Sequence, residues 1–177
     1  MTIAIQPIYT QIVGSGGAST VTFNNIPQTF TDIKVLASMR DGRTDAGFAN
    51  VNLRFNANTS SVYSNINIAG TNGGGSAGTF GSQTAFFYNL YCNGQVSTAN
   101  TFSNNEILIP NYTNSSFKQV LIDNVVETNE TVTNSYLLVL NAGLFRSTTP
   151  ITSITFTAQN GVFQQHSTFT LYGITKG

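Results

Sequence analysis

The stretch Pro150–Ile174, PITSITFTAQNGVFQQHSTFTLYGI, decides the fold of this chain. Apolar and polar residues alternate over 154–159 and again over 167–174, which is typical of strands with one buried face. Between the two segments stands Asn160-Gly161, a turn signal because both residues tolerate a positive φ. We therefore predict a closing antiparallel hairpin at the centre of a β-sheet. Its buried face is expected to carry Ile154, Phe156, Ala158, Ser167, Phe169, Leu171 and Gly173.

The same period of two recurs through the rest of the chain. We expect further strands over 9–13, 19–23, 30–40, 49–57, 65–69, 83–93, 105–109, 117–127 and 132–145. The first two of these should form a hairpin around Gly14–Gly17, and the strand over 65–69 should point Ile66 and Ile68 inward. About nine or ten strands without a helical stretch predict an all-β protein, an antiparallel two-sheet β-sandwich.

The length of the chain fits one domain. It has 177 residues, of which 40% are apolar, enough to build a core. No repeat or linker divides it, so we expect a single domain over 1–177. Residues 1–12 are expected to be either an N-terminal arm that reaches a neighbouring subunit or an edge strand. Residues 70–82 are rich in glycine but no Gly-Lys-Ser/Thr motif follows, so we expect a mobile loop and not a phosphate site.

Charge is scarce in this sequence. Charged residues make up 8% of the chain and its formal net charge is zero, whereas an ordinary soluble domain has about 25% charged residues. Such a surface suits a protein that stays docked in an assembly. It argues against a nucleic-acid partner, which needs a basic stripe. No apolar run reaches the roughly 18–20 residues of a membrane helix, so we expect no membrane partner either.

The residues that carry chemistry are few. Cys92 is the only cysteine and His166 the only histidine, which disfavours a disulfide, a zinc site and a catalytic triad. We expect Cys92 to be buried. The loop residues considered for calcium, which lack the usual spacing, are Asp41, Asp45, Asn50, Glu127, Asn129 and Glu130. No tryptophan is present to form a sugar platform beside a carboxylate pair. We expect no enzymatic activity, no cofactor and no metal.

The closing stretch ITSITFTAQNGVFQQHSTFTLYGI resembles the last hairpin of a recurrent virion module of tailed bacteriophages and cyanophages. Three upstream blocks fit the same module in the same order: IPQTFTDIKVLASMR, NLRFN and SNNEILIPNYT. Together the blocks span about Ile26 to Ile174. The resemblance implies a jelly-roll-like β-sandwich in a head or tail structural protein, made in the host cytoplasm without a signal peptide and assembled into the virion.

Two functions agree with this resemblance. The first is a capsid decoration or cement protein that braces the head through contacts with the major capsid protein. The alternative is a tail fibre or receptor-binding protein that joins tail proteins and recognises a host-surface glycan. The module begins within about 25 residues of Met1 and leaves no shaft, so we favour the first. The resemblance also implies a homotrimer.

Three groups of residues are candidates for partner contacts. The isoleucines belong to the N-terminal segment, the arginines come from one loop and the next strand, and the remaining residues stand in the glycine-rich segment. We expect the arginines either to pair with Asp41 and Asp45 or to face an acidic patch on a partner. The candidate contacts are Ile3, Ile5, Ile8, Arg40, Arg43, Arg54, Asn72, Gly73 and Gly74.

Overall fold

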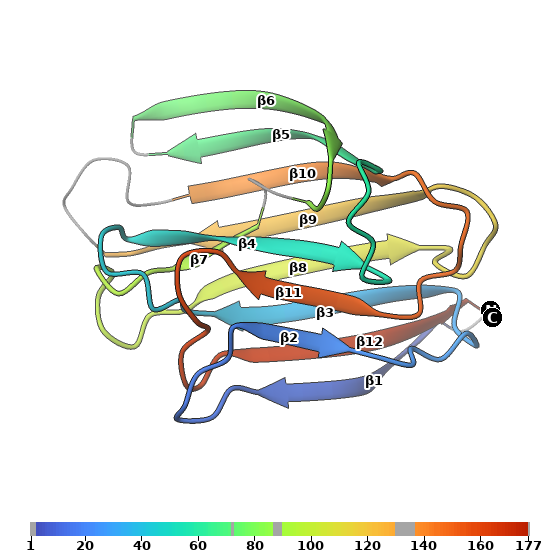
Figure 1. The fold of residues 1–177 in the computed structure, drawn as a ribbon, viewed down its shortest axis with the longest axis horizontal. Coiled ribbons are helices and arrows are strands. Elements are labelled where there is room, and N and C mark those ends of the chain that lie inside the picture. Colours follow the sequence, from blue (N-terminus) through green and yellow to red (C-terminus); the bar gives the residue numbers. More distant parts are fainter. Residues whose placement is uncertain (1–2, 72, 87–89, 130–136, 177) are drawn as a thin grey trace.

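The computed structural model describes residues 3–71, 73–86, 90–129 and 137–176, and these contain strands but no helix. An eight-stranded sheet has the order β1-β12-β3-β8-β9-β10-β5-β6, and a four-stranded sheet has the order β2-β11-β4-β7 (Figure 1). Every pairing between strands is antiparallel, so the two-sheet β-sandwich is confirmed, with twelve strands in the described residues where nine or ten were expected. The strands are β1 Ile3–Ile12, β2 Thr20–Phe23, β3 Asp32–Met39, β4 Phe48–Phe55, β5 Tyr63–Thr71, β6 Gly74–Gln83, β7 Tyr91–Asn93, β8 Ser103–Pro110, β9 Lys118–Val126, β10 Leu137–Phe145, β11 Ile154–Ala158 and β12 Thr168–Lys176.

The first five strands and the last three alternate between the two sheets along the chain. β1 pairs with β12 in the large sheet, while β2 pairs with β11 in the small one. In the same way β3 lies between β12 and β8, while β4 lies between β11 and β7. Eight strands therefore form the two layers of a jelly-roll-like sandwich. The other four strands, β9, β10, β5 and β6, extend the large sheet beyond β8; we call them the extension.

Both predicted hairpins are wrong in their pairing. The segments 154–158 and 167–174 do not pair with each other, because β11 and β12 lie in opposite sheets. The same holds for β1 and β2. The predicted faces are nevertheless correct, since Phe156, Phe169 and Leu171 are all fully buried. Alternation in a sequence indicates which side of a strand is buried, but a connection that crosses between layers leaves the same pattern as a hairpin.

The segment 63–83 departs furthest from expectation. The predicted mobile loop over 70–82 is wrong, because β6 runs through it and pairs with β5 from Gly74 to Gln83. The inward placement of Ile66 and Ile68 is also wrong, because both are exposed. The strand begins at Tyr63, whose buried hydroxyl donates to the Phe55 carbonyl over 3.2 Å. With Tyr63 facing inward, a period of two puts the isoleucines on the outer side.

Aromatic rings hold the extension to the small sheet. The ring of Tyr63 on β5 lies 5.0 Å from that of Phe145 on β10, and Phe145 lies 5.3 Å from Phe55 on β4. Phe86 completes the cluster, 5.1 Å from Tyr63 and 5.7 Å from Phe55. Such offset and edge-on contacts add about 0.5–1.5 kcal/mol per pair beyond area burial. The cluster therefore fixes the start of β5 and the end of β10 to the small sheet.

Two predicted strands extend into residues outside the described ranges. Of the strand expected over 83–93, the structure gives β7 at its end and a bridge between Phe86 and Leu53. Of the strand over 132–145, it gives β10 from Leu137 onward. Throughout the described ranges, no helix is long and apolar enough to cross a membrane.

Candidate functional site: an apolar sheet face and a polar end groove

The N-terminal candidate contacts lie in an edge strand. β1 pairs with β12 from Ile3 to Ile12 and forms the outer strand of the large sheet. Ile5 is 60% exposed, while Ile8 is partly buried and packs against the core. Of the two alternatives for this segment, the structure shows the edge strand. Of Ile5 and Ile8, Ile5 is therefore the one that is available to a partner.

The three arginines are each held by a different part of the chain. The guanidinium of Arg43 pairs with Asp45 over 2.6 Å, as one of the two alternatives predicted. Arg54 donates from Nε to the carbonyl of Thr84 over 3.0 Å. Arg40 is buried, and its guanidinium donates to the backbone carbonyls of Gln95, Ser97, Thr98 and Thr101. Arg40 therefore organises the loop after β7 from inside.

The glycine candidates form the turn between β5 and β6. The amide of Gly73 donates to Thr71 Oγ1 over 3.2 Å, and that hydroxyl donates to the Gly74 carbonyl over 3.2 Å. Gly74 has a φ of 125°, which favours glycine. Asn72 lies outside the described residues. This turn joins β5 and β6, which form the edge of the large sheet opposite β1 (Figure 1). The three candidate groups therefore do not meet at one site. As partner contacts they remain predictions.

A group of exposed aliphatic side chains forms an apolar surface on the outer side of the extension. Six aliphatic side chains on β5, β9 and β10 are between 39% and 60% exposed there. The register places Leu140 beside Ile68 on β5 and beside Asp123 on β9. The same pairing brings Leu138 beside Val125. We call this surface the outer apolar face; it consists of Ile66, Ile68, Leu121, Val125, Leu138 and Leu140.

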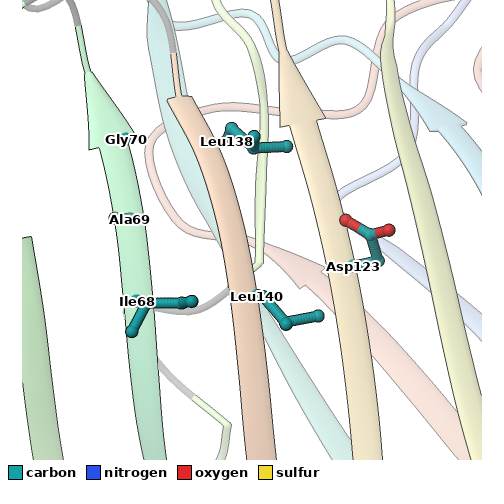
Figure 2. A pocket seen from close by; sticks show the side chains of 6 residues that line it. All are labelled: Ile68, Ala69, Gly70, Asp123, Leu138 and Leu140. Carbon is teal, nitrogen blue, oxygen red and sulfur yellow. The ribbon is translucent and has the colours of Figure 1, made fainter. Parts of the chain in front are cut away.

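The centre of the outer apolar face is a shallow hollow (Figure 2). It has a volume of about 430 Å³ and is lined mainly by Ile68, Leu138 and Leu140. Asp123 supplies a carboxylate at its β9 side. Sequence reasoning missed this surface because it placed the isoleucines of β5 inside. A signal was present in Leu137–Leu140, where four consecutive apolar residues must put apolar side chains on both sides of a strand.

A polar groove lies at the end of the sandwich where β7 leads into its following loop. Its volume is about 420 Å³. Neutral side chains dominate its lining, and Phe102 contributes an aromatic ring. We call it the end groove; it is lined by Arg40, Gln95, Ala99, Asn100, Phe102, Gln164, Gln165 and His166. Amide groups beside an aromatic ring can donate and accept hydrogen bonds with an uncharged polar ligand.

The residues considered for chemistry are dispersed. Cys92 is fully buried, as predicted, and burial raises the pKa of its thiol. Burial also raises the pKa of the Asp41 carboxyl, while Asp45 is occupied by Arg43. Glu130 lies outside the described residues. Among those that are described, no three His, Cys, Asp or Glu side chains are placed to hold a metal ion.

The comparisons with known proteins do not identify the chain. No family model matches it, and no curated protein matches it significantly.

Proposed function

We propose that this chain is a non-enzymatic structural protein of a phage virion, most simply a decoration or cement protein that braces the head by binding the major capsid protein. The observation that carries this proposal is the outer apolar face, a patch of half-exposed aliphatic side chains on a sandwich with 8% charged residues. Contiguous apolar patches of several hundred Å² mark interaction surfaces on folded proteins.

The construction of the sandwich supports a mechanical role. Its long strands are joined into two layers, and the aromatic cluster fixes the extension to them. A surface presented on a stiff sheet binds without a large cost of ordering the protein. The resemblance to the virion module supports the same role and leads us to expect a homotrimer. Light scattering on the purified protein measures its mass directly.

Removal of the protein from purified particles tests the proposal. Heads stripped of a cement protein lose resistance to heat and to osmotic shock, and adding back the purified chain restores it. A Leu140→Glu variant should restore less resistance than an Ile12→Glu variant, which changes an exposed isoleucine on the far edge strand. Particles that keep full resistance without the chain would contradict the cement function.

The alternative function is a tail fibre or receptor-binding protein, and the end groove favours it. The groove presents neutral amides beside the ring of Phe102, which is a suitable lining for an uncharged sugar. Binding to a glycan array that is lost in Phe102→Ala and Gln165→Ala, and kept in Thr10→Ala, would support this function. In that case removing the protein should abolish adsorption to the host and leave the heat resistance of the head unchanged.

A further inference from the structure

The outer apolar face belongs to the strands that extend the large sheet beyond the jelly-roll-like layers. All six of its residues come from β5, β9 and β10. On the opposite side of the same strands, Tyr63 and Phe145 pack into the aromatic cluster. The inner side of the extension also holds the buried amides of Asn65, Asn124 and Asn141, so its polar groups are enclosed while its outer side exposes aliphatic side chains. An exposed aliphatic patch of this kind is typical of a surface that a partner covers.

The rest of the same outer side is mainly polar, although it also exposes aliphatic residues such as Leu36 and Ile12. The register connects the outer apolar face to the far edge along the row Leu138, Val125, Asn104, Ser38, Thr168 and Ile12. On the strands between them, Lys34 and Glu106 form an ion pair of 2.6 Å. The change from aliphatic to polar side chains therefore falls within one continuous sheet surface. Exposed aliphatic side chains gather on β5, β10 and β9, whereas Leu36 and Ile12 each pair with polar residues of the neighbouring strands.

The size of the patch fits a contact between two protein chains. Its six side chains present on the order of 500 Å² of apolar surface, similar to the largest patch on a typical monomer. A specific interface buries about 800 Å² on each partner. Because about 65% of a homodimer interface is apolar, such an interface requires on the order of 500 Å² of apolar surface from each copy. One outer apolar face supplies that amount.

The charges around the patch favour an identical partner. The six residues of the face are uncharged, and one carboxylate, that of Asp123, stands among them on β9 and lines the central hollow. A partner chosen by charge would need a matching set of ionic groups, which this face does not offer. A second copy offers a face of the same neutral composition. If β10 lies at the symmetry axis, Asp123 of one copy faces the β5 side of the other, so the two carboxylates stay apart.

We propose that copies of this chain associate by packing their outer apolar faces on one another, with Leu140 close to the symmetry axis. The contact is a sheet-on-sheet packing that covers the outer side of β5, β9 and β10. The inference goes beyond the proposed function, because it gives the outer apolar face to a second copy and leaves contacts with the capsid protein to other surfaces of the associated copies. It concerns the isolated chain and does not depend on the proposed function. It assigns a two-fold contact that joins copies in pairs, which is separate from the three-fold contacts of the homotrimer that the resemblance implies.

Paired substitutions test the surface. Leu140→Glu and Ile68→Glu place a charge in the centre of the face, whereas Ile12→Glu makes the same kind of change at an isoleucine that is 67% exposed on the same side of β1. We expect light scattering to show an oligomer for the wild type and for Ile12→Glu. The two face variants should dissociate with a dissociation constant raised about 30-fold or more. Unchanged melting temperatures show that the variants still fold.

Cross-linking tests the geometry. Residues beside a symmetry axis lie next to their own copies, so Leu140→Cys should form a disulfide-linked pair under mild oxidation while Ile12→Cys should not. Cys92 is fully buried and does not compete. A monomeric wild type at about 100 µM, well above the dissociation constants of specific interfaces, would overturn the proposal. So would an oligomer that Leu140→Glu and Ile12→Glu affect equally. If the chain were monomeric and still bound to phage heads, the self-association proposed here would be wrong and the proposed function would still hold.

Discussion

Phe156 on β11 and Phe169 on β12 pack against each other between the two sheets, with ring centroids 5.2 Å apart. The two residues belong to consecutive strands, yet one strand lies in each layer. The contact therefore closes the sandwich at the C-terminal end of the chain. Phe169 also lies 5.1 Å from Phe163, which stands in the connection between these strands. The last 25 residues thus contribute to both sheets and to the core between them.

Truncation of Phe169 should destabilise the whole sandwich. Because the ring is fully buried and contacts both neighbouring rings, Phe169→Ala should lower the free energy of unfolding by about 3–5 kcal/mol. Chemical denaturation with a fluorescence or circular dichroism readout measures this change. Thr170→Ala on the outer side of the same strand should cost less than about 1 kcal/mol. Equal losses in both variants would contradict the placement of Phe169 in the core.

Replacement of Arg40 should loosen the loop after β7. The guanidinium donates to four backbone carbonyls between residues 95 and 101, and a lysine ammonium has fewer donors without the planar geometry. We expect Arg40→Lys to lower the free energy of unfolding by about 2 kcal/mol and to speed amide hydrogen exchange in 95–101. Arg54→Lys, which loses one partly exposed bond, is the control. Unaltered exchange in 95–101 would refute the structural role of Arg40.

Gly94 should not accept a side chain. A Cβ at this position would lie 2.2 Å from the carbonyl oxygen of Ala46, so the backbone would have to move. We expect Gly94→Ala to lower the free energy of unfolding by about 1–3 kcal/mol. Gly14→Ala is the matched control, because nothing lies within 4 Å of its added Cβ. Thermal melts of the two variants give the comparison, and a destabilised Gly14→Ala with an unaffected Gly94→Ala would be the opposite of what the structure requires.

Asp41 should make the protein less stable as the pH rises. Burial raises the pKa of its carboxyl above the ordinary value of 3.8, so the folded state holds the proton more tightly than the unfolded state. Its contribution to stability is fully present below pH 3.8 and is lost as the pH rises through the raised pKa. Asp41→Asn keeps an acceptor for the Arg43 amide. As the pH rises through the raised pKa, its free energy of unfolding should therefore increase relative to that of the wild type.

Asp45 provides a control of opposite sign for the pH experiment. Its side-chain hydrogen bond with Arg43 lowers the pKa of its carboxyl. The contribution of Asp45 is therefore present above pH 3.8 and is lost as the pH falls through the lowered pKa. Because Asp45 is exposed, Asp45→Asn should change the pH profile only slightly, in the direction opposite to Asp41→Asn. Denaturation curves from pH 3 to 8 measure the free energy of unfolding of both proteins. A difference between Asp41→Asn and the wild type that does not change with pH would rule out the predicted titration.

The sequence predicted strands and buried faces well and pairings poorly. Alternation identified β3, β4, β8 and β9, because a buried face imposes a period of two wherever the strand lies. It could not identify the partner of β11, since the choice between a hairpin and a crossing to the other layer depends on contacts with distant strands. The glycine content of 74–83 led to the wrong prediction of a loop. Antiparallel pairing with β5 makes this segment a strand although glycine has a low intrinsic preference for strands.

The site was less predictable than the fold. Ile66 and Ile68 were assigned to the core on the rule that aliphatic residues face inward, and the structure places them outside because Tyr63 and Asn65 occupy the inner positions. The arginines were considered as a group by their closeness in sequence, whereas Arg40 is used inside the protein. An exposed apolar face cannot be recognised from one strand alone, since it arises where three strands from separate parts of the chain lie side by side.

The proposal that this chain is part of a virion is tested most directly by electron cryomicroscopy of the phage particles in which we expect it. The account predicts density on the head surface that fits an eight-stranded and a four-stranded sheet, with the outer apolar face buried between copies. Density on the tail would favour the fibre alternative. Particles that contain none of this chain would contradict the claim.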